Sequence, residues 1–521
     1  MLARDLVLPH RLAAIAAEAP DRELLVRADT GERVTYGAFQ ESVLRWAGAL
    51  ERLGINAGDR VATVLRPSTD AYATWIAVSW LRAIEVPVNT ALTGPLLTHV
   101  LGDSGARIAI ASADLLPAVA GIAVELPDLE AIVVIGEPTE SVASPVRILP
   151  AADVFGAPPD ASMPGPEPYD ICCLCYTSGT TGPAKGVLVP WAEQWEFTDG
   201  TSAGIDDTTV YYSIYPMFHV SGKHALYTAA LSGRHLVFRE QFSVQRFWPD
   251  VREHGCTAVG LIGPMARMLF IQPPQDDDGD NLVQWSAVGP MFPEIAEFGR
   301  RFNVRVVSGY GMTEIGAPLM TFDVTDWQSC GRARDGYDLR IVDEHDAELP
   351  HGQVGELIVR SDQPWRLNAG YWGRPELTAH AWRNGWFHTG DAFRRNEAGD
   401  FYFVDRLKDS MRRRGENISS FEVEMLVNTA DSVAESAAVP VPSELGEDDI
   451  KIVVVPKQGV VIDPEVLLKE LDERMPRYMR PRCVEVVDAL PKTPTSRVRK
   501  VELRTGARNV RTWDRETGCY S

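Results

Sequence analysis

Several features are scarce in this chain of 521 residues, and each absence excludes a class of protein. It contains only 7 cysteines, too few in so long a chain for a disulfide-stabilised scaffold. No run of about 18 apolar residues occurs, so the sequence predicts no membrane-spanning helix. Basic residues are also fewer than acidic ones. The 51 Lys and Arg against 72 Asp and Glu give a net charge of −21, which disfavours binding to nucleic acid or to an anionic membrane.

What is present is an ordinary globular composition, with 45% hydrophobic and 24% charged residues. Residues 1–26 mix charged side chains with alanine and leucine, which predicts an amphipathic helix and not a signal peptide. The composition and this N-terminal segment together predict a cytoplasmic protein with several domains.

Short apolar runs alternate with helical patterns near the N-terminus. Residues 60–65, 106–111 and 131–135 are predicted to be buried strands, and residues 36–53 and 71–83 helices. This alternation predicts an α/β fold with layered, mostly parallel sheets. Residues 145–168, rich in Pro, Ala, Asp and Gly, are expected to form a surface connection.

The pattern changes in the last third of the chain. From residue 337 to 360 the strands shorten and glycines mark turns between them, as in a β-barrel-like subdomain. A charged stretch follows residue 406 and leads into a smaller α+β segment. We therefore expect a large N-terminal domain over residues 1–404 and a small C-terminal domain over residues 410–521.

Residues 176–187 carry the most informative motif, Tyr-Thr-Ser-Gly-Thr-Thr-Gly-Pro-Ala-Lys-Gly-Val, directly after a predicted strand. Its glycines allow close approach of the backbone to a ligand, and its hydroxyls and lysine are donors suited to phosphate oxygens. It is not a Walker A loop, because Lys185 is followed by Gly186 where that motif has Ser or Thr. The motif predicts phosphate binding by Thr177, Ser178, Gly179, Thr180, Thr181, Gly182 and Lys185.

This loop resembles the signature loop of the adenylate-forming superfamily, which includes acyl-CoA synthetases, peptide-synthetase adenylation domains and luciferases. Among these, the chain is most similar to carnitine- and crotonobetaine-type CoA ligases, notably at residues 246–248 and 512–516. Five further motifs resemble those of the superfamily and occur in its order, at residues 215–219, 309–314, 386–391, 405–409 and 414–418.

The resemblance implies a role for each motif. Thr177 to Lys185 would hold the β- and γ-phosphates of ATP, while Thr313 would contact the α-phosphate and Glu314 would bind Mg²⁺. Asp391 would accept hydrogen bonds from the two ribose hydroxyls, and Arg406 would reinforce that contact. The adenine pocket would consist of Gly289, Pro290, Tyr310 and Gly311.

The acid substrate is expected to bind beside His219, which by resemblance acts as a wall and gate of its pocket and not as a general base. The other pocket residues implied by the resemblance are Lys223, His224, Gly263 and Gly309. Because Lys223 and His224 are polar where a fatty chain would need apolar walls, the sequence favours a small polar or aromatic acid.

The resemblance also places a hinge at residues 405–409, centred on Lys408, about which a mobile C-terminal lid rotates between two half-reactions. Near the C-terminus the family has a Gly-Lys pair whose lysine bridges the carboxylate and the α-phosphate. Here Ser496 and Arg497 replace that pair. Arg497 keeps the positive charge, but on a planar guanidinium group. Three interpretations follow: Arg497 takes over the role of the family lysine, Lys492 or Lys500 does so, or the enzyme activates a different acid whose charge distribution suits a guanidinium.

We therefore predict an AMP-forming ligase that uses ATP and Mg²⁺ to activate an acid and transfers it to coenzyme A. The replaced lysine leaves other acceptors open: an amine, a carrier-protein thiol, or an aromatic amine that reacts with ATP-activated nitrite. A non-catalytic nucleotide-binding relative is a third possibility, against which the intact Glu314 and Asp391 argue. The sequence does not indicate an oligomeric state.

Overall fold

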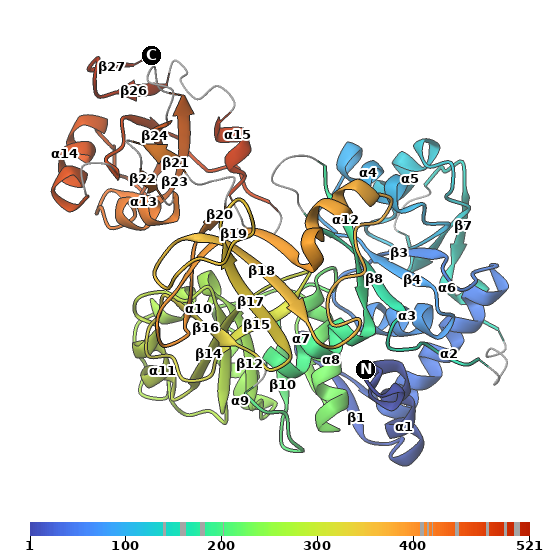
Figure 1. Ribbon diagram of the computed structural model, residues 1–521. Coiled ribbons are helices and arrows are strands. Elements are labelled where there is room, and N and C mark those ends of the chain that lie inside the picture. The colour runs from blue at the N-terminus through green and yellow to red at the C-terminus, as the bar shows by residue number, and fades with distance from the viewer. Residues whose placement is uncertain are drawn as a thin grey trace.

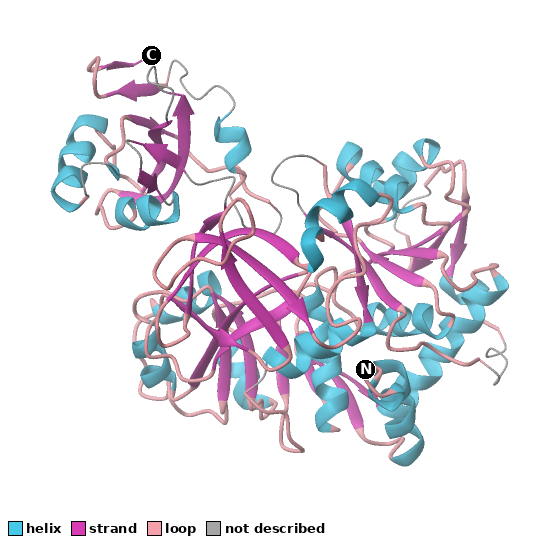
Figure 2. Ribbon diagram, viewed as in Figure 1, coloured by secondary structure: helices cyan, strands magenta, loops and turns pink. Residues whose placement is uncertain are grey.

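The computed structural model describes residues 1–138, 142–156, 163–177, 183–201, 203–406, 411–413, 416–418, 420–442, 448–475, 479–493, 498–504 and 511–520. A larger body holds most of the chain, and the C-terminal part lies at one end of it (Figure 1). Both parts combine helices and strands (Figure 2).

The first large sheet has seven strands in the order β7-β6-β5-β3-β4-β8-β9. All neighbours are parallel except β8 and β9, which form an antiparallel hairpin at the edge. The strands are β3 (Arg60–Val64), β4 (Ile84–Pro87), β5 (Ile108–Ser112), β6 (Ala131–Ile135), β7 (Arg147–Pro150), β8 (Ile171–Thr177) and β9 (Lys185–Pro190).

The second large sheet has thirteen strands in the order β17-β18-β19-β20-β16-β15-β14-β13-β12-β10-β11-β1-β2. Its parallel part consists of β1 (Glu23–Arg27), β10 (Tyr211–Ser213), β11 (Leu236–Phe238), β12 (Ala258–Ile262), β13 (Trp285–Gly289) and β14 (Arg305–Met312). The antiparallel strands are β2 (Glu32–Thr35), β15 (Gly316–Thr321), β16 (Ser329–Ala333), β17 (Tyr337–Val342), β18 (Gly355–Ser361), β19 (Phe387–Arg395) and β20 (Phe401–Arg406).

Helices connect and cover these strands, and capping side chains fix where two of them begin. Thr35 accepts a hydrogen bond from the Ala38 amide at the start of α2, and Ser68 accepts one from Ala71 at the start of α3. The helices of the larger body are α1 (Leu8–Glu18), α2 (Tyr36–Arg52), α3 (Thr69–Trp80), α4 (Gly94–Ser104), α5 (Leu116–Ile122), α6 (Ala151–Val154), α7 (Trp191–Thr201), α8 (Val220–Ser232), α9 (Phe247–Glu253), α10 (Gly263–Phe270), α11 (Ile295–Phe302) and α12 (Pro375–Ala381), with short 3₁₀ turns η1 (Arg4–Leu6), η2 (Ala123–Glu125) and η3 (Arg383–Gly385).

The C-terminal part has its own two sheets. One pairs β21 (Met411–Arg413) with β22 (Glu416–Ile418), and the other contains β23 (Val433–Pro442), β24 (Asp448–Pro456), β25 (Cys483–Val486), β26 (Thr512–Asp514) and β27 (Cys519–Tyr520). Its helices are α13 (Ser420–Val427), α14 (Pro464–Arg474) and α15 (Lys500–Arg504).

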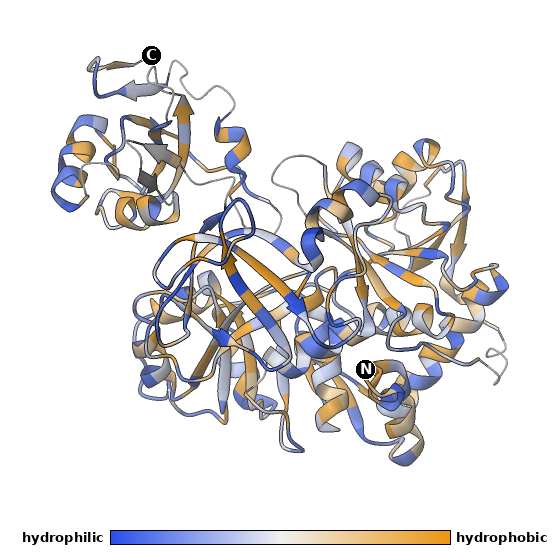
Figure 3. Cartoon of the chain, in the orientation of Figure 1, coloured by the Kyte–Doolittle hydropathy of each residue, from blue (hydrophilic) through white to orange (hydrophobic). Residues whose placement is uncertain are grey.

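The hydrophobic cores follow the same division. The buried members of four apolar clusters lie between Val7 and Phe401, and those of the two others between Met411 and Leu490. The apolar colour gathers on the strands of the large sheets (Figure 3). Separate cores agree with a large N-terminal and a small C-terminal domain, so the predicted α/β class and this architecture are confirmed.

Two local predictions need correction. Residues 1–26 are not one helix, because α1 ends before Pro20 and residues 23–27 form β1, which pairs with β11. The expected connection at residues 145–168 contains β7, which pairs in parallel with β6, and the short helix α6. In both places pairing with another strand overrides the local composition. Among the described helices, none is long and apolar enough to cross a membrane.

Candidate active site

The site predicted from the motifs lies beyond the carboxyl ends of parallel strands, where open α/β sheets bind their ligands. Residues 215–219 follow β10, Gly263 follows β12, and Gly289 with Pro290 ends β13. Beyond its parallel segment, β14 continues into residues 308–312. The topology thus brings the predicted acid pocket and adenine pocket to one edge of the thirteen-stranded sheet.

Close backbone contact at this edge requires glycine. A side chain at Gly263 would place its Cβ 2.2 Å from the carbonyl oxygen of Pro290, and one at Gly309 would place it 2.3 Å from that of Leu319. Both distances are far below van der Waals contact. The glycines therefore allow the segments around the predicted pockets to approach one another.

The β8–β9 hairpin carries the ends of the phosphate motif. Thr177 and Lys185 are directly paired in its register, so the antiparallel hairpin brings these two predicted phosphate ligands together. The hydroxyl of Thr177 is buried and has no hydrogen-bond partner among the described residues. A buried donor of this kind is suited to a phosphate oxygen. Residues 178–182, the rest of the motif, lie outside the described residues.

Glu314 lies in the turn between β14 and β15, with 4% of its surface exposed. The Nζ atom of Lys185 is 3.6 Å from its Oε1, and the hydroxyl of Tyr371 donates a hydrogen bond of 3.0 Å to the same oxygen. Burial and the Glu314 charge raise the pKa of Tyr371, so its hydroxyl keeps the proton that it donates. A carboxylate next to a phosphate motif fits Mg²⁺, a hard cation that prefers oxygen ligands.

The predicted adenine and ribose residues form one cluster. Tyr310 donates a hydrogen bond of 2.6 Å to Oδ2 of Asp391, and Nε of Arg406 lies 3.7 Å from Oδ1. Asp391 and Arg406 are direct partners between β19 and β20, which accounts for their proximity. The ring of Tyr310 packs edge-on against Phe393, with 4.7 Å between the ring centroids.

His219 occupies the N-cap position of α8, and its ring lies 4.7 Å from that of Phe218. The thiol of Cys175 in β8 donates to the Phe218 carbonyl over 3.5 Å, which connects this motif to the strand that leads into the phosphate loop. Thr313 lies beside Glu314 in the turn after β14, and Gly311 packs against the start of β15.

Lys223 was predicted to line the acid pocket, but it forms a buried ion pair in the core instead. Its side chain is completely buried, forms an ion pair with Glu85 of β4, and lies 4.3 Å from the centroid of the Trp75 ring. Thr63 donates a further hydrogen bond of 2.8 Å to Glu85. The core thus accounts for the charge of Lys223 without a substrate, and the inference of a polar pocket from this residue loses its basis.

His224 is also buried, with its ring edge-on to Tyr211 at 4.9 Å between centroids. Burial lowers its pKa to about 4, so the imidazole is neutral at pH 7. A neutral, ring-packed histidine is compatible with a pocket wall for an aromatic or uncharged group.

The structure describes the C-terminal residues only in part. Lys408 and Arg497 lie outside the described residues, so their predicted roles stay predictions. Lys492 pairs with Glu435 at 2.6 Å, and Lys500 pairs with Glu424 at 2.7 Å. Both lysines considered as substitutes for the family lysine therefore have acidic partners within the C-terminal part.

The predicted hinge begins inside a strand, because Asp405 and Arg406 belong to β20. Oδ2 of Asp405 accepts hydrogen bonds of 2.6 Å from both the amide and the hydroxyl of Ser420, at the start of α13. This contact joins the two parts of the molecule and was not predicted. Tyr371 was missed as well, since only its long-range contacts with Lys185 and Glu314 reveal it.

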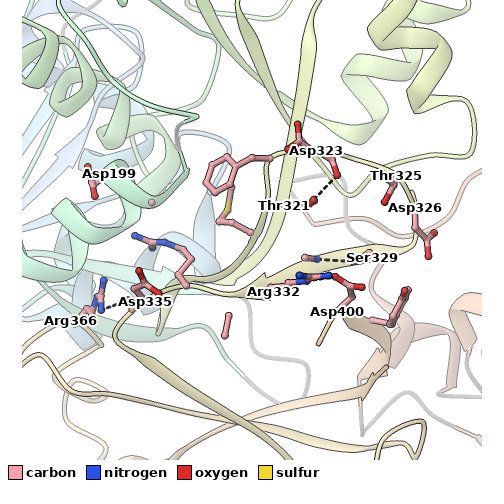
Figure 4. Close-up of a pocket in the computed structure, with 17 residues that line it drawn as sticks. Asp199, Thr321, Asp323, Thr325, Asp326, Ser329, Arg332, Asp335, Arg366 and Asp400 are labelled. Carbon is pink, nitrogen blue, oxygen red and sulfur yellow. Dashed lines mark hydrogen bonds and ion pairs between the residues drawn. The ribbon is translucent and has the colours of Figure 1, made fainter. Parts of the chain in front are cut away.

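A cavity of about 760 Å³ lies elsewhere, between the end of α7, the loop after β15, and β16. Aspartate and arginine side chains line it, and Arg332 pairs with Asp400 over 2.8 Å (Figure 4). None of the predicted site residues lines it. We therefore assign the chemistry to the motif site and not to this cavity.

Comparison with known proteins agrees with the motifs. The model of the AMP-binding enzyme family matches residues 12–372, and that of the AMP-binding enzyme C-terminal domain matches residues 422–497. The crotonobetaine/carnitine–CoA ligases of Citrobacter koseri and Salmonella arizonae are 28% and 29% identical to this chain. The matches cover 90% and 91% of this chain and 93% of each relative.

Solved structures share the fold. The o-succinylbenzoate CoA synthetase MenE of Bacillus subtilis, in complex with an acyl-adenylate, superimposes with a TM-score of 0.82 at 22% identity, over 95% of this chain and 97% of its own. ATP-bound MatB of Rhodopseudomonas palustris gives 0.83 at 24% identity, over 96% and 99%. The chain therefore belongs to the AMP-binding enzyme family, the adenylate-forming superfamily that its motifs resemble, as an AMP-forming ligase of the acid–CoA ligase type.

Proposed function

We propose that this protein activates a small polar or aromatic acid as its adenylate and transfers the acyl group to coenzyme A in the cytoplasm. Ligases of this type use ATP, Mg²⁺ and coenzyme A. The observation that carries the proposal is that the predicted phosphate and metal residues, Lys185 and Glu314, meet at 3.6 Å, although they are far apart in the sequence.

In the first half-reaction a carboxylate oxygen attacks the α-phosphorus of ATP, and pyrophosphate leaves. We assign Lys185 and the buried hydroxyl of Thr177 to the phosphates, because both are donors at the mouth of the β8–β9 hairpin. Bound Mg²⁺ would neutralise phosphate charge, with Glu314 as its carboxylate ligand. Catalysis of this kind rests on positioning and on fixed charges.

We assign Asp391 and Arg406 to the ribose, with Tyr310 as the wall of the adenine pocket. Asp391 has 7% of its surface exposed, and its carboxylate is held by Tyr310 and Arg406. A carboxylate fixed from two sides loses little conformational entropy when it accepts the ribose hydroxyls. In the second half-reaction the thiol of coenzyme A attacks the acyl carbonyl and AMP leaves.

The named relatives and the histidines of the predicted pocket support the proposed class of acid. The relatives named crotonobetaine/carnitine–CoA ligase support a small polar acid. The neutral, buried ring of His224 supports an uncharged or aromatic group beside it. His219, at the start of the same helix, is proposed as the wall and gate of the pocket, together with Gly263 and Gly309.

The test is the release of AMP and pyrophosphate from ATP and Mg²⁺ with a panel of acids, nitrite included, with and without coenzyme A. We expect release that requires a carboxylic acid, and an acyl-CoA product. Glu314→Gln should abolish release, whereas Glu240→Gln, which removes a carboxylate paired with Arg27 at 3.0 Å, should not. AMP release that needs an amine or nitrite and ignores coenzyme A would contradict the proposed acceptor.

A further inference from the structure

A short segment after β18 connects the phosphate hairpin to the metal residue. We call residues 368–372 the strap. It runs beside β9, with hydrogen bonds from the Leu188 amide to the Gly370 carbonyl, from Ala369 to Leu188, and from Trp372 to Gly186, all between 2.9 and 3.0 Å. An isolated antiparallel bridge pairs Tyr371 with Val187. The strap therefore acts as a third strand beside the β8–β9 hairpin.

The first residue of the strap holds the turn that carries Glu314. Both the backbone amide and the side-chain amide of Asn368 donate to the Glu314 carbonyl, at 3.1 and 2.6 Å. The side chain of Asn368 also accepts a hydrogen bond of 2.8 Å from the Gly370 amide. One segment of five residues thus fixes the position of β9 relative to the backbone of Glu314.

Tyr371 lies in the middle of the strap, with 6% of its surface exposed, and contacts both charged groups. Its hydroxyl donates to Oε1 of Glu314, and the Nζ atom of Lys185 lies 3.9 Å from the centroid of its ring. The ammonium is also 3.6 Å from the same carboxylate oxygen. Ammonium, carboxylate and phenol thus form a closed triangle of contacts.

Binding of a polyphosphate would change the contacts of Lys185 and Glu314. A phosphate oxygen competes with Glu314 for the ammonium of Lys185, because both are anionic. A carboxylate with 4% exposure that loses its cation is costly to keep ionised, unless other donors hold it. The hydroxyl of Tyr371 is such a donor, and the ring offers the ammonium an attractive face close to the carboxylate.

We propose that Tyr371 is a positioning residue for the adenylation half-reaction: its hydroxyl holds Glu314 for Mg²⁺ while its ring holds Lys185 for the phosphates. This inference rests on the adenylation step of the proposed function. It is independent of which acid is activated and of which acceptor receives the acyl group. If Tyr371 served only to pack against its neighbours, its ring would be sufficient. The hydroxyl is needed only for Glu314, which makes the two parts separable by substitution.

The experiment measures ATP binding by calorimetry as Mg²⁺ is titrated, without any acid or coenzyme A. Tyr371→Phe keeps the ring and loses the hydroxyl, so the Mg²⁺ concentration for half-maximal ATP binding should rise about tenfold, the effect of one hydrogen bond to a charged group. Tyr371→Leu should in addition weaken ATP binding at saturating Mg²⁺ by about threefold, because it removes the cation–π contact.

A matched control is Tyr212→Phe. Tyr212 is also buried, and its hydroxyl donates to a carboxylate, that of Asp250, over 2.9 Å. This control should leave the Mg²⁺ dependence unchanged. An unchanged Mg²⁺ midpoint in Tyr371→Phe, or an equal shift in Tyr212→Phe, would overturn the proposal. A failure of every acid to give AMP would count against the proposed function and would leave this binding measurement interpretable.

Discussion

The hydroxyl of Tyr310 donates a hydrogen bond to Oδ2 of Asp391, and the two oxygen atoms lie 2.6 Å apart. The residues belong to β14 and β19, and to motifs that the sequence assigns to adenine and ribose. Burial and the charge of Asp391 raise the pKa of Tyr310 well above its usual value, so the hydroxyl remains a donor at neutral pH. The two nucleoside motifs are therefore held as one unit.

Asp391→Ala should weaken ATP binding by about ten- to a hundredfold. The substitution removes an ionised acceptor for the ribose and leaves Tyr310 and Arg406 without this partner, and hydrogen bonds to charged groups contribute about 1.5–3 kcal/mol each. Calorimetry with ATP and Mg²⁺ measures the effect. Asp400→Ala is the control, because Asp400 lies between β19 and β20 and pairs with Arg332 at the surface. Unchanged affinity in Asp391→Ala would refute the ribose assignment.

Lys223→Met should destabilise the protein by about 3–5 kcal/mol, because it leaves the carboxylate of Glu85 buried without its cation. Urea unfolding measures this loss. The double variant Lys223→Met/Glu85→Leu, which removes both charges, should recover much of the stability. If Lys223 were instead a pocket residue, the single variant would keep its stability and lose affinity for the acid.

The elements that the sequence predicted correctly are those with a local signal. The strands at β3, β5 and β6 are continuous apolar runs, and the helices α2 and α3 follow helical periodicity. The prediction of a phosphate motif also uses a local signal, since its glycines, hydroxyls and lysine lie within one short segment. The structure adds that Thr177 and Lys185 are cross-strand partners.

The features that the sequence missed depend on tertiary contacts. Glu85 and Lys223 are 138 positions apart, and nothing in either local sequence indicates that the two charges neutralise each other. The same holds for Tyr371, because its partner Lys185 lies in β9 of the seven-stranded sheet and its partner Glu314 lies in the turn between β14 and β15 of the thirteen-stranded sheet. The strand β7 lies in a segment rich in turn residues and forms because β6 offers it a parallel edge.

Protonation of His224 should destabilise the fold at acid pH. Burial lowers the pKa of His224 from 6.5 to about 4, so between these values the unfolded chain binds a proton that the native protein does not. The contribution is fully present above pH 6.5 and is lost as the pH falls toward 4, on the order of 3 kcal/mol in all.

Urea unfolding at several pH values tests this prediction. His224→Gln should show a smaller loss of unfolding free energy between pH 6.5 and pH 4 than the unmodified protein, whatever its stability at pH 7. His345→Gln is the control, because the His345 side chain is 81% exposed. Equal slopes for His224→Gln and the unmodified protein would show that other groups cause the acid sensitivity.

Arg497→Ala should suppress AMP formation from ATP and acid while sparing release of AMP from a preformed adenylate. Arg497 lies outside the described residues, and this prediction rests on its position in place of the family lysine. The two neighbouring lysines are engaged elsewhere: Lys492 with Glu435, and Lys500 with Glu424 and the hydroxyl of Ser420. A cation that stabilises charge in the transition state contributes about a hundred- to a thousandfold in rate, so the loss should be large.

Separate assays of the two half-reactions distinguish the possible roles of these cations. Lys492→Met should be close to the unmodified protein in both, because its partner Glu435 is 35% exposed and a surface ion pair contributes little. Lys500→Met should affect both half-reactions alike, since Lys500 supports the α13 residues that contact Asp405 at the junction of the two parts. A selective loss of adenylation in Lys500→Met, with Arg497→Ala unaffected, would transfer the role to Lys500. Equal loss of both half-reactions in Arg497→Ala would instead indicate a defect of folding or of the junction.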